Sequence, residues 1–144
     1  MTAKTYLRRI KWNEIKIEQK KFQLRGLGEN IDYLHAIDYS KDKVQTSPRD
    51  IIGEQVAKMT DMKIRIVREI AAFEVERDKA INQIQSMTDG RYSAILFKRY
   101  VEGKEFLTIA KETGYDFNYT RNMHGEALRA FETRFLMRGG ESIG

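Results

Sequence analysis

A seven-residue repeat of apolar side chains over residues 50–86 constrains the fold of this chain more than any other feature. Lys63 and Arg77 interrupt it, but every other position in its two series is apolar: Ile52, Met59, Ile66, Phe73, Ala80 and Met87 in one, Val56, Ile70 and Ile84 in the other. Such a repeat predicts a long helix that packs against another helix. The pattern fits a hairpin within one chain and a homodimer through the long helix equally well.

The composition agrees with a helical protein and excludes several classes. The chain has 144 residues, 33% of them charged, with one proline and ten glycines. It contains no cysteine, which excludes disulfides, thiolate metal sites and a cysteine nucleophile. No apolar run approaches the roughly 18–20 residues that span a bilayer, and the basic start lacks the apolar stretch of a secretion signal. We therefore expect a cytoplasmic protein with no membrane partner.

The N-terminal part is expected to be a helical arm over residues 1–87. A first helix is predicted over about 3–24, a polar connector over 25–49 and the long helix over about 50–86. The first helix has two apolar strips and should therefore touch more than one neighbour: Leu7, Ile10, Ile17 and Leu24 in one, Trp12, Ile15 and Phe22 in the other. Gly26, Gly28 and Pro48 are among the turn-forming residues that mark the connector.

The charge is uneven along the chain. The formal net charge is +5, and the first 26 residues carry eight Lys and Arg against two Glu. A basic surplus favours a polyanionic partner such as nucleic acid, although a solvated helix face often has the same composition.

The region 88–138 is predicted to be a three-helix domain containing a helix-turn-helix. Thr88 or Asp89 can cap its first helix, which ends near Gly103. The next two helices, over about 105–113 and 117–135, should cross closely. Ala110 supplies the small residue that this crossing needs, and Gly114 supplies the positive φ of the turn.

The second helix of this motif should be capped by Asp116 and should pack inward through residues three and four apart. The inward set is Thr120, Met123, Ala127 and Phe131, with Leu128 beside it, against Ile109 and Tyr115. This register leaves Asn118, Tyr119, Arg121 and Asn122 outward at the start of the helix, with Gly125 and Arg129 further along. Asn pairs with adenine and Arg with guanine in the major groove, so these side chains are the candidate DNA-binding residues. Arg129, Lys104 and Lys111 are candidates for phosphate contact.

The stretch RYVEGKEFLTIAKETGYDFNYTRNMHGEAL, residues 99–128, resembles phage and prophage regulators of Gram-positive bacteria. These are the sigma-like late-transcription activators of the ArpU and RinA kind and related domains of unknown function. The resemblance rests on Arg99-Tyr100, Ile109-Ala110, Gly114-Tyr115 and the HGEAL run from His124, and DKVQTS at 42–47 is similar to a connector in those proteins.

The resemblance implies a domain like sigma factor region four behind a helical arm. Such a protein would bind double-stranded DNA near a promoter, act with RNA polymerase and work in the cytoplasm of a bacterial host. Two alternatives stay open: a DNA-loading assembly protein like a small terminase subunit, and a module that binds polymerase without reading DNA.

No pattern in the sequence indicates an enzyme. The chain has no Gly-rich phosphate loop, nucleophile elbow or paired-carboxylate motif. Its two histidines, His35 and His124, are too far apart in sequence to suggest a metal site, and no cofactor is expected. His124 is expected to make a structural hydrogen bond.

Overall fold

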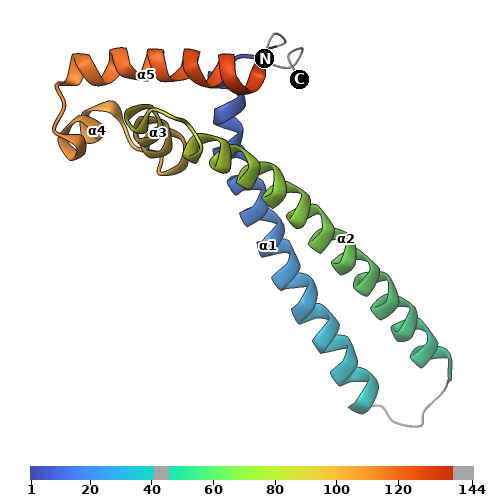
Figure 1. Ribbon diagram of the computed structural model, residues 1–144. Coiled ribbons are helices and arrows are strands. Elements are labelled where there is room, and N and C mark those ends of the chain that lie inside the picture. Colours follow the sequence, from blue (N-terminus) through green and yellow to red (C-terminus); the bar gives the residue numbers. More distant parts are fainter. Residues whose placement is uncertain (41–45, 138–144) are drawn as a thin grey trace. The chain divides into compact units, whose positions relative to one another are not determined.

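The computed structural model describes residues 1–40 and 46–137, and every regular element among them is a helix. Two long helices, α1 (Ala3–Ser40) and α2 (Thr46–Gln85), form a hairpin (Figure 1). The helices α3 (Gly90–Leu96), α4 (Phe106–Thr113) and α5 (Phe117–Phe131) follow. Short π-helical turns extend α3 as η1 (Phe97–Val101) and α5 as η2 (Glu132–Leu136). The all-α prediction, with a hairpin and then three helices, is confirmed.

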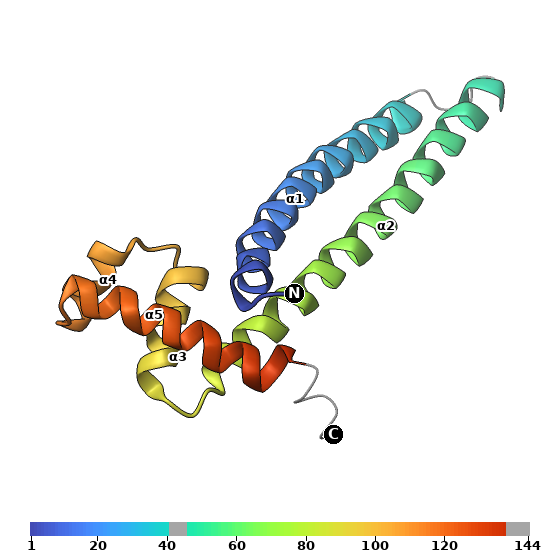
Figure 2. The same ribbon diagram turned by 90° about the horizontal axis from the view of Figure 1, so that it is seen from above.

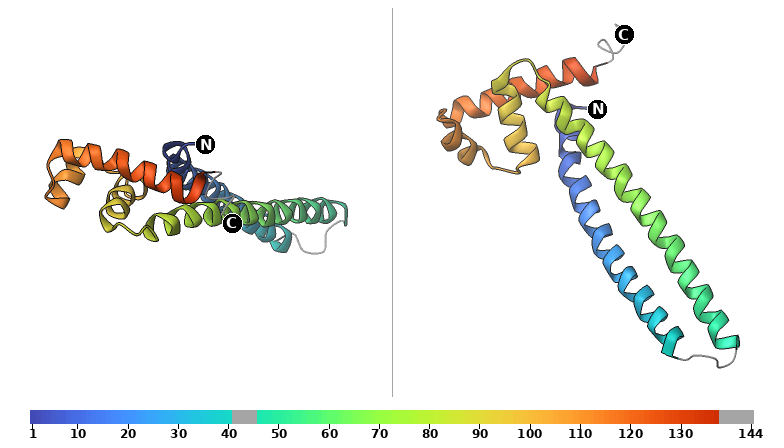
Figure 3. Two further views of the ribbon diagram at one scale, coloured as in Figure 1. Left: turned by 45° about the horizontal axis from the view of Figure 1, so that its top comes forward. Right: turned by 60° about the horizontal axis from the view of Figure 1, so that its bottom comes forward.

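The chain divides into two compact units. The distal unit comprises Ile15–Glu74, in which α1 and α2 run side by side (Figure 3, right). Its core holds four buried apolar side chains, two from each helix: Ile17, Leu27, Ile66 and Ile70. The apolar repeat of α2 is therefore used within the chain, against α1. Lys63 is exposed at its seam position, where a lysine ammonium stays hydrated.

The predicted connector over 25–49 is wrong for its first part, because α1 continues to Ser40. Gly26 and Gly28 each cost roughly 1 kcal/mol relative to Ala inside a helix. Leu27 is only 8% exposed, and Leu24 and Ile31 pack against the same core. Burial of these apolar side chains offsets the glycines. Residues 42–45, most of the DKVQTS segment, lie outside the described residues.

The second apolar strip expected on the first helix is also not buried. Trp12 is 62% exposed and Phe22 is 72% exposed. Between these two residues α1 packs against α2, and Ile17 faces that helix. One neighbour can bury only one face of a helix, so Trp12 and Phe22 remain in solvent.

The second unit comprises Met1–Glu14 and the described residues from Val75 on. Figure 2 shows its helices α3, α4 and α5 gathered together. Its core includes Leu7 and Ile10 of α1 and Ile84 of α2, packed with Leu96 and Phe131. The three C-terminal helices therefore share their core with the start of α1 and the end of α2, whereas the sequence suggests a boundary at residue 87. No helix in the described ranges is both long and apolar enough to cross a membrane.

Candidate nucleic-acid interface

The turn between α4 and α5 has the geometry that the sequence predicts. Gly114 adopts φ 77° at the C-terminus of α4, and its N–H donates to the carbonyl of Ala110 at 2.9 Å. A left-handed residue at this position ends the helix and redirects the chain. Ala110 is 6% exposed, which agrees with its predicted place at a close crossing.

Asp116 caps α5 as predicted. Its carboxylate accepts hydrogen bonds from the backbone N–H of Asn118 at 2.9 Å and of Tyr119 at 3.2 Å. Two of the N–H groups that lack partners within the helix are thereby satisfied. Asp116 is thus committed to the backbone of α5.

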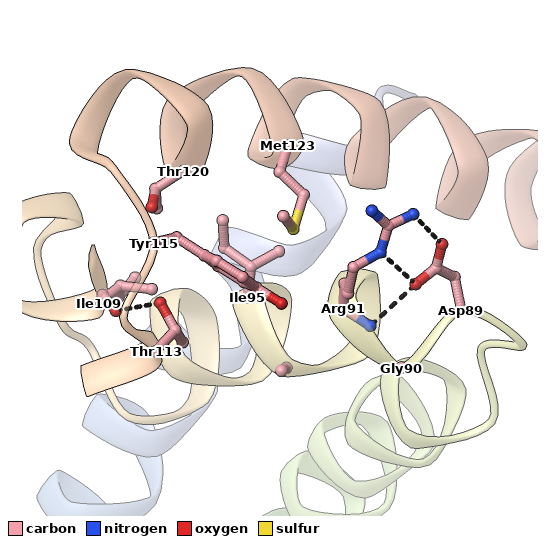
Figure 4. A pocket seen from close by; sticks show the side chains of 10 residues that line it. Asp89, Gly90, Arg91, Ile95, Ile109, Thr113, Tyr115, Thr120 and Met123 are labelled. Atoms are coloured by element: carbon pink, nitrogen blue, oxygen red, sulfur yellow. Dashed lines mark hydrogen bonds and ion pairs between the residues drawn. The ribbon is translucent and has the colours of Figure 1, made fainter. Parts of the chain in front are cut away.

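The predicted inward face of α5 is buried. Thr120, Ala127 and Phe131 are fully buried and Met123 is 3% exposed. The one polar group in this set is satisfied, because the Thr120 hydroxyl donates to the Asp116 carbonyl at 2.9 Å. Thr120 and Met123 point from α5 into a pocket of about 490 Å³ lined also by Ile95, Ile109 and Tyr115 (Figure 4). Tyr115 differs from the prediction, because it remains 38% exposed at the edge of this pocket.

The opposite face of α5 is open to solvent. The four candidate base-reading residues, Asn118, Tyr119, Arg121 and Asn122, are all exposed, and so is Arg129. Successive α-helical residues are turned by about 100°, so Asn118, Asn122, Gly125 and Arg129 form the middle of this face. Tyr119 then lies on one flank and Arg121 on the other.

The Tyr119 flank is tied to α3 by a residue that the sequence did not single out. Nη1 of Arg91 donates to the Tyr119 hydroxyl at 3.0 Å. Figure 4 shows that the same guanidinium forms an ion pair with Asp89, at 2.9 Å. Asp89 in turn caps α3, accepting from the Arg91 N–H. The ring of Tyr115 meets that of Tyr119 edge-on at 5.2 Å. Tyr119 is thus exposed but oriented.

The Arg121 flank borders a small basic pocket of about 150 Å³. Its lining comes from the start of α1, from η1, from α4 and from α5: Lys4, Arg8, Arg99, Tyr100, Phe106, Arg121 and His124. Only Arg121 among the cationic side chains was predicted to have a functional role. Lys4 and Arg8 lie more than ninety residues before Arg99 in the chain, so spacing along the sequence could not connect them.

His124 makes the structural hydrogen bond that the sequence predicts. Its Nε2 lies 2.8 Å from the Tyr100 hydroxyl, and its ring packs edge-on against Phe106 at 4.8 Å. Burial, together with the positive charges of Arg99, Lys4 and Arg121, lowers the pKa of His124 to about 4. The imidazole is therefore neutral at pH 7.

The three candidate phosphate contacts outside this pocket differ in their surroundings. Nζ of Lys104 pairs with Glu102 at 2.9 Å and with Glu112 at 2.6 Å, and Glu112 also pairs with Lys98. These carboxylates raise the pKa of Lys104 and neutralise much of its charge. Lys111 and Arg129 are exposed, and neither forms an ion pair with another described residue. A phosphate would therefore meet less competition at Lys111 or Arg129 than at Lys104.

No group of three or more His, Asp or Glu side chains within residues 1–40 and 46–137 is placed to hold a metal ion. No protein-family model, curated protein or solved structure matches the chain significantly. Because no such match suggests a function, the functional proposal rests on the geometry of the α5 surface.

Proposed function

We propose that this protein binds double-stranded DNA by inserting the N-terminal half of α5 into the major groove. One observation carries the proposal: Asn118, Arg121 and Asn122 are all exposed on a helix whose opposite face is locked into the core. Amide and guanidinium groups match the hydrogen-bonding edges of adenine and guanine. A helix fixed by a tight turn and a side-chain cap holds such groups in a constant register.

We further propose that the binding regulates transcription near a promoter, together with RNA polymerase. This finer proposal is supported by the resemblance of residues 99–128 to sigma-like phage regulators. A DNA-loading assembly protein would use the same α5 surface but would form a ring of many copies. The mass of the protein in solution distinguishes the two, since a regulator of this kind is expected as a monomer or dimer.

The test compares binding of labelled genomic duplex fragments by the unchanged protein and by the double variant Asn118→Ala, Asn122→Ala. Each lost bidentate contact to a base costs roughly 1–3 kcal/mol, so preference among fragments should fall at least tenfold. A matched control is Asn30→Ala, Asn82→Ala, because both residues are exposed asparagines on the long helices. Fluorescence anisotropy at several salt concentrations measures affinity and its electrostatic share.

Three results would count against the proposal. The first is that the unchanged protein binds no duplex at low salt. The second is that the double variant keeps the same preference among fragments, and the third is that the control variant loses as much of this preference as the double variant. Binding of polymerase in the absence of any DNA binding would instead identify a module that does not read DNA.

A further inference from the structure

The four cations of the basic pocket lie together without a carboxylate to balance them. None of Lys4, Arg8, Arg99 and Arg121 forms an ion pair within the described part of the chain, and the pocket lining contains no acidic residue. Lys4 and Arg8 are also four residues apart on one helix, a spacing at which like charges repel. A fold that gathers uncompensated positive charge in one hollow is well suited to an anion.

Two of the guanidinium groups lie beside the Phe106 ring that lines the pocket. The Arg99 guanidinium lies 4.5 Å from the centroid of the Phe106 ring, and its Nη1 donates to the Lys104 carbonyl at 3.0 Å. Arg121 lies 5.8 Å from the centroid of the same ring. Because the Phe106 ring and the Lys104 carbonyl hold the Arg99 guanidinium before any ligand arrives, less side-chain entropy of Arg99 is lost on binding.

The size and polarity of the pocket fit one phosphate group. Its volume of about 150 Å³ leaves room for a group as small as a phosphate. Arginine presents a planar pair of N–H groups that matches phosphate oxygens, and lysine supplies a point charge. The neutral His124 and the Tyr100 hydroxyl add hydrogen-bonding groups without adding negative charge.

The position of the pocket beside α5 indicates where that phosphate comes from. Arg121 both flanks the outward face of α5 and lines the pocket. When a recognition helix enters the major groove, the sugar–phosphate backbone runs along its flank.

We propose that the basic pocket binds one phosphate of the DNA backbone, so that Lys4 and Arg8 of the first helix form part of the interface. The inference rests on the proposed function, because it assigns the phosphate to DNA. It also gives the basic start of the chain a role that is independent of base reading.

The test is the double variant Lys4→Gln, Arg8→Gln, which removes two exposed charges and leaves the core untouched. The slope of log affinity against log salt concentration should become shallower by about 0.9, the change expected for one lost phosphate contact. Affinity should fall equally for all duplexes, and preference among sequences should persist. The matched control Lys11→Gln, Lys16→Gln removes two exposed charges of the same helix that lie outside the pocket. A salt slope that changes equally in both variants would overturn the proposal.

A second measurement separates this inference from the proposed function. His124 lies in the pocket, and the only other histidine, His35, lies exposed on the distal part of α1 and serves as an internal reference. Inorganic phosphate should shift the NMR signals of the His124 ring and leave those of His35 unchanged. If the unchanged protein binds no duplex, the proposed function is contradicted, whether or not phosphate shifts the His124 signals. A phosphate-induced shift of His124 together with an unaltered salt slope would identify a free phosphorylated ligand and overturn the assignment to DNA.

Discussion

Gly114 and Gly125 have different backbone conformations. Gly114 has φ 77°, a conformation that costs other residues roughly 1–2 kcal/mol, whereas Gly125 lies within α5. A Cβ at Gly125 would meet only the Arg129 side chain, at an ordinary distance of 3.6 Å.

Alanine substitution should therefore have opposite effects at these two glycines. Gly114→Ala should lower the free energy of unfolding by about 1–2 kcal/mol. Gly125→Ala should raise it by about 0.5–1 kcal/mol, because glycine is a poor helix former. Urea denaturation of the two variants measures both changes. Equal changes in the same direction would show that the turn at Gly114 is not held in the left-handed region.

His124 should make the stability of the protein depend on pH. Its pKa is about 4 in the folded state and 6.5 as the ordinary value, so between these values the unfolded chain binds more protons. The His124 contribution is therefore complete above pH 6.5 and is lost as the pH falls toward 4. The groups that face the ring are Tyr100, which stays neutral because burial raises its pKa, and the basic side chains Lys4, Arg99 and Arg121.

The prediction is checked by urea denaturation at pH 7 and pH 5. The unchanged protein should lose more stability between these two values than the variant His124→Gln, which has no imidazole to protonate. A pH dependence that survives in His124→Gln without reduction would mean that the imidazole is not the responsible group.

At the scale of single elements, α2 depends on which side chains face α1. Ile66 is 1% exposed in the distal core, whereas Ile64, two residues earlier, is 45% exposed. Ile66→Ala should lower the free energy of unfolding of the distal unit by about 2–5 kcal/mol, because it removes buried methyl groups and leaves a cavity. Ile64→Ala, the matched control, should change it by less than about 0.5 kcal/mol. Amide hydrogen exchange in α1 and α2 measures the difference. Equal effects of the two variants would contradict the assigned seam.

The elements that could be predicted from sequence are those whose signals are local. The heptads of α2, the Gly114 turn and the Asp116 cap each depend on residues within a few positions of one another. The extension of α1 was missed because Gly26 and Gly28 locally oppose a helix, while the packing of Leu27 against α2 favours it. That packing depends on residues more than thirty positions away.

The candidate site also has features that could be predicted from sequence and features that could not. The exposure of Asn118, Arg121 and Asn122 follows from helical periodicity within α5, so it could be predicted. The contacts that flank them could not. Arg91 reaches Tyr119 across 28 positions of sequence, and Lys4 meets Arg121 only because the start of α1 packs into the C-terminal core.

At the scale of the whole molecule, the compact unit that carries α5 includes the start of the first helix, up to Glu14. Leu7 is fully buried and Ile10 is 1% exposed in a core shared with Phe131. The backbone N–H of Ala3 also donates to Glu132 at 2.9 Å. The start of α1 therefore belongs to the core that supports α5. In the proposed complex it also contributes to the pocket that binds a DNA phosphate.

The central claim is that the exposed face of α5 reads base sequence. The most direct test is to select bound duplexes from a random-sequence library. The unchanged protein should enrich one shared sequence of a few base pairs, and Asn118→Ala, Asn122→Ala should enrich none while still retaining duplexes at low salt. Enrichment of the same sequence by both proteins, or of no sequence by the unchanged protein, would contradict it.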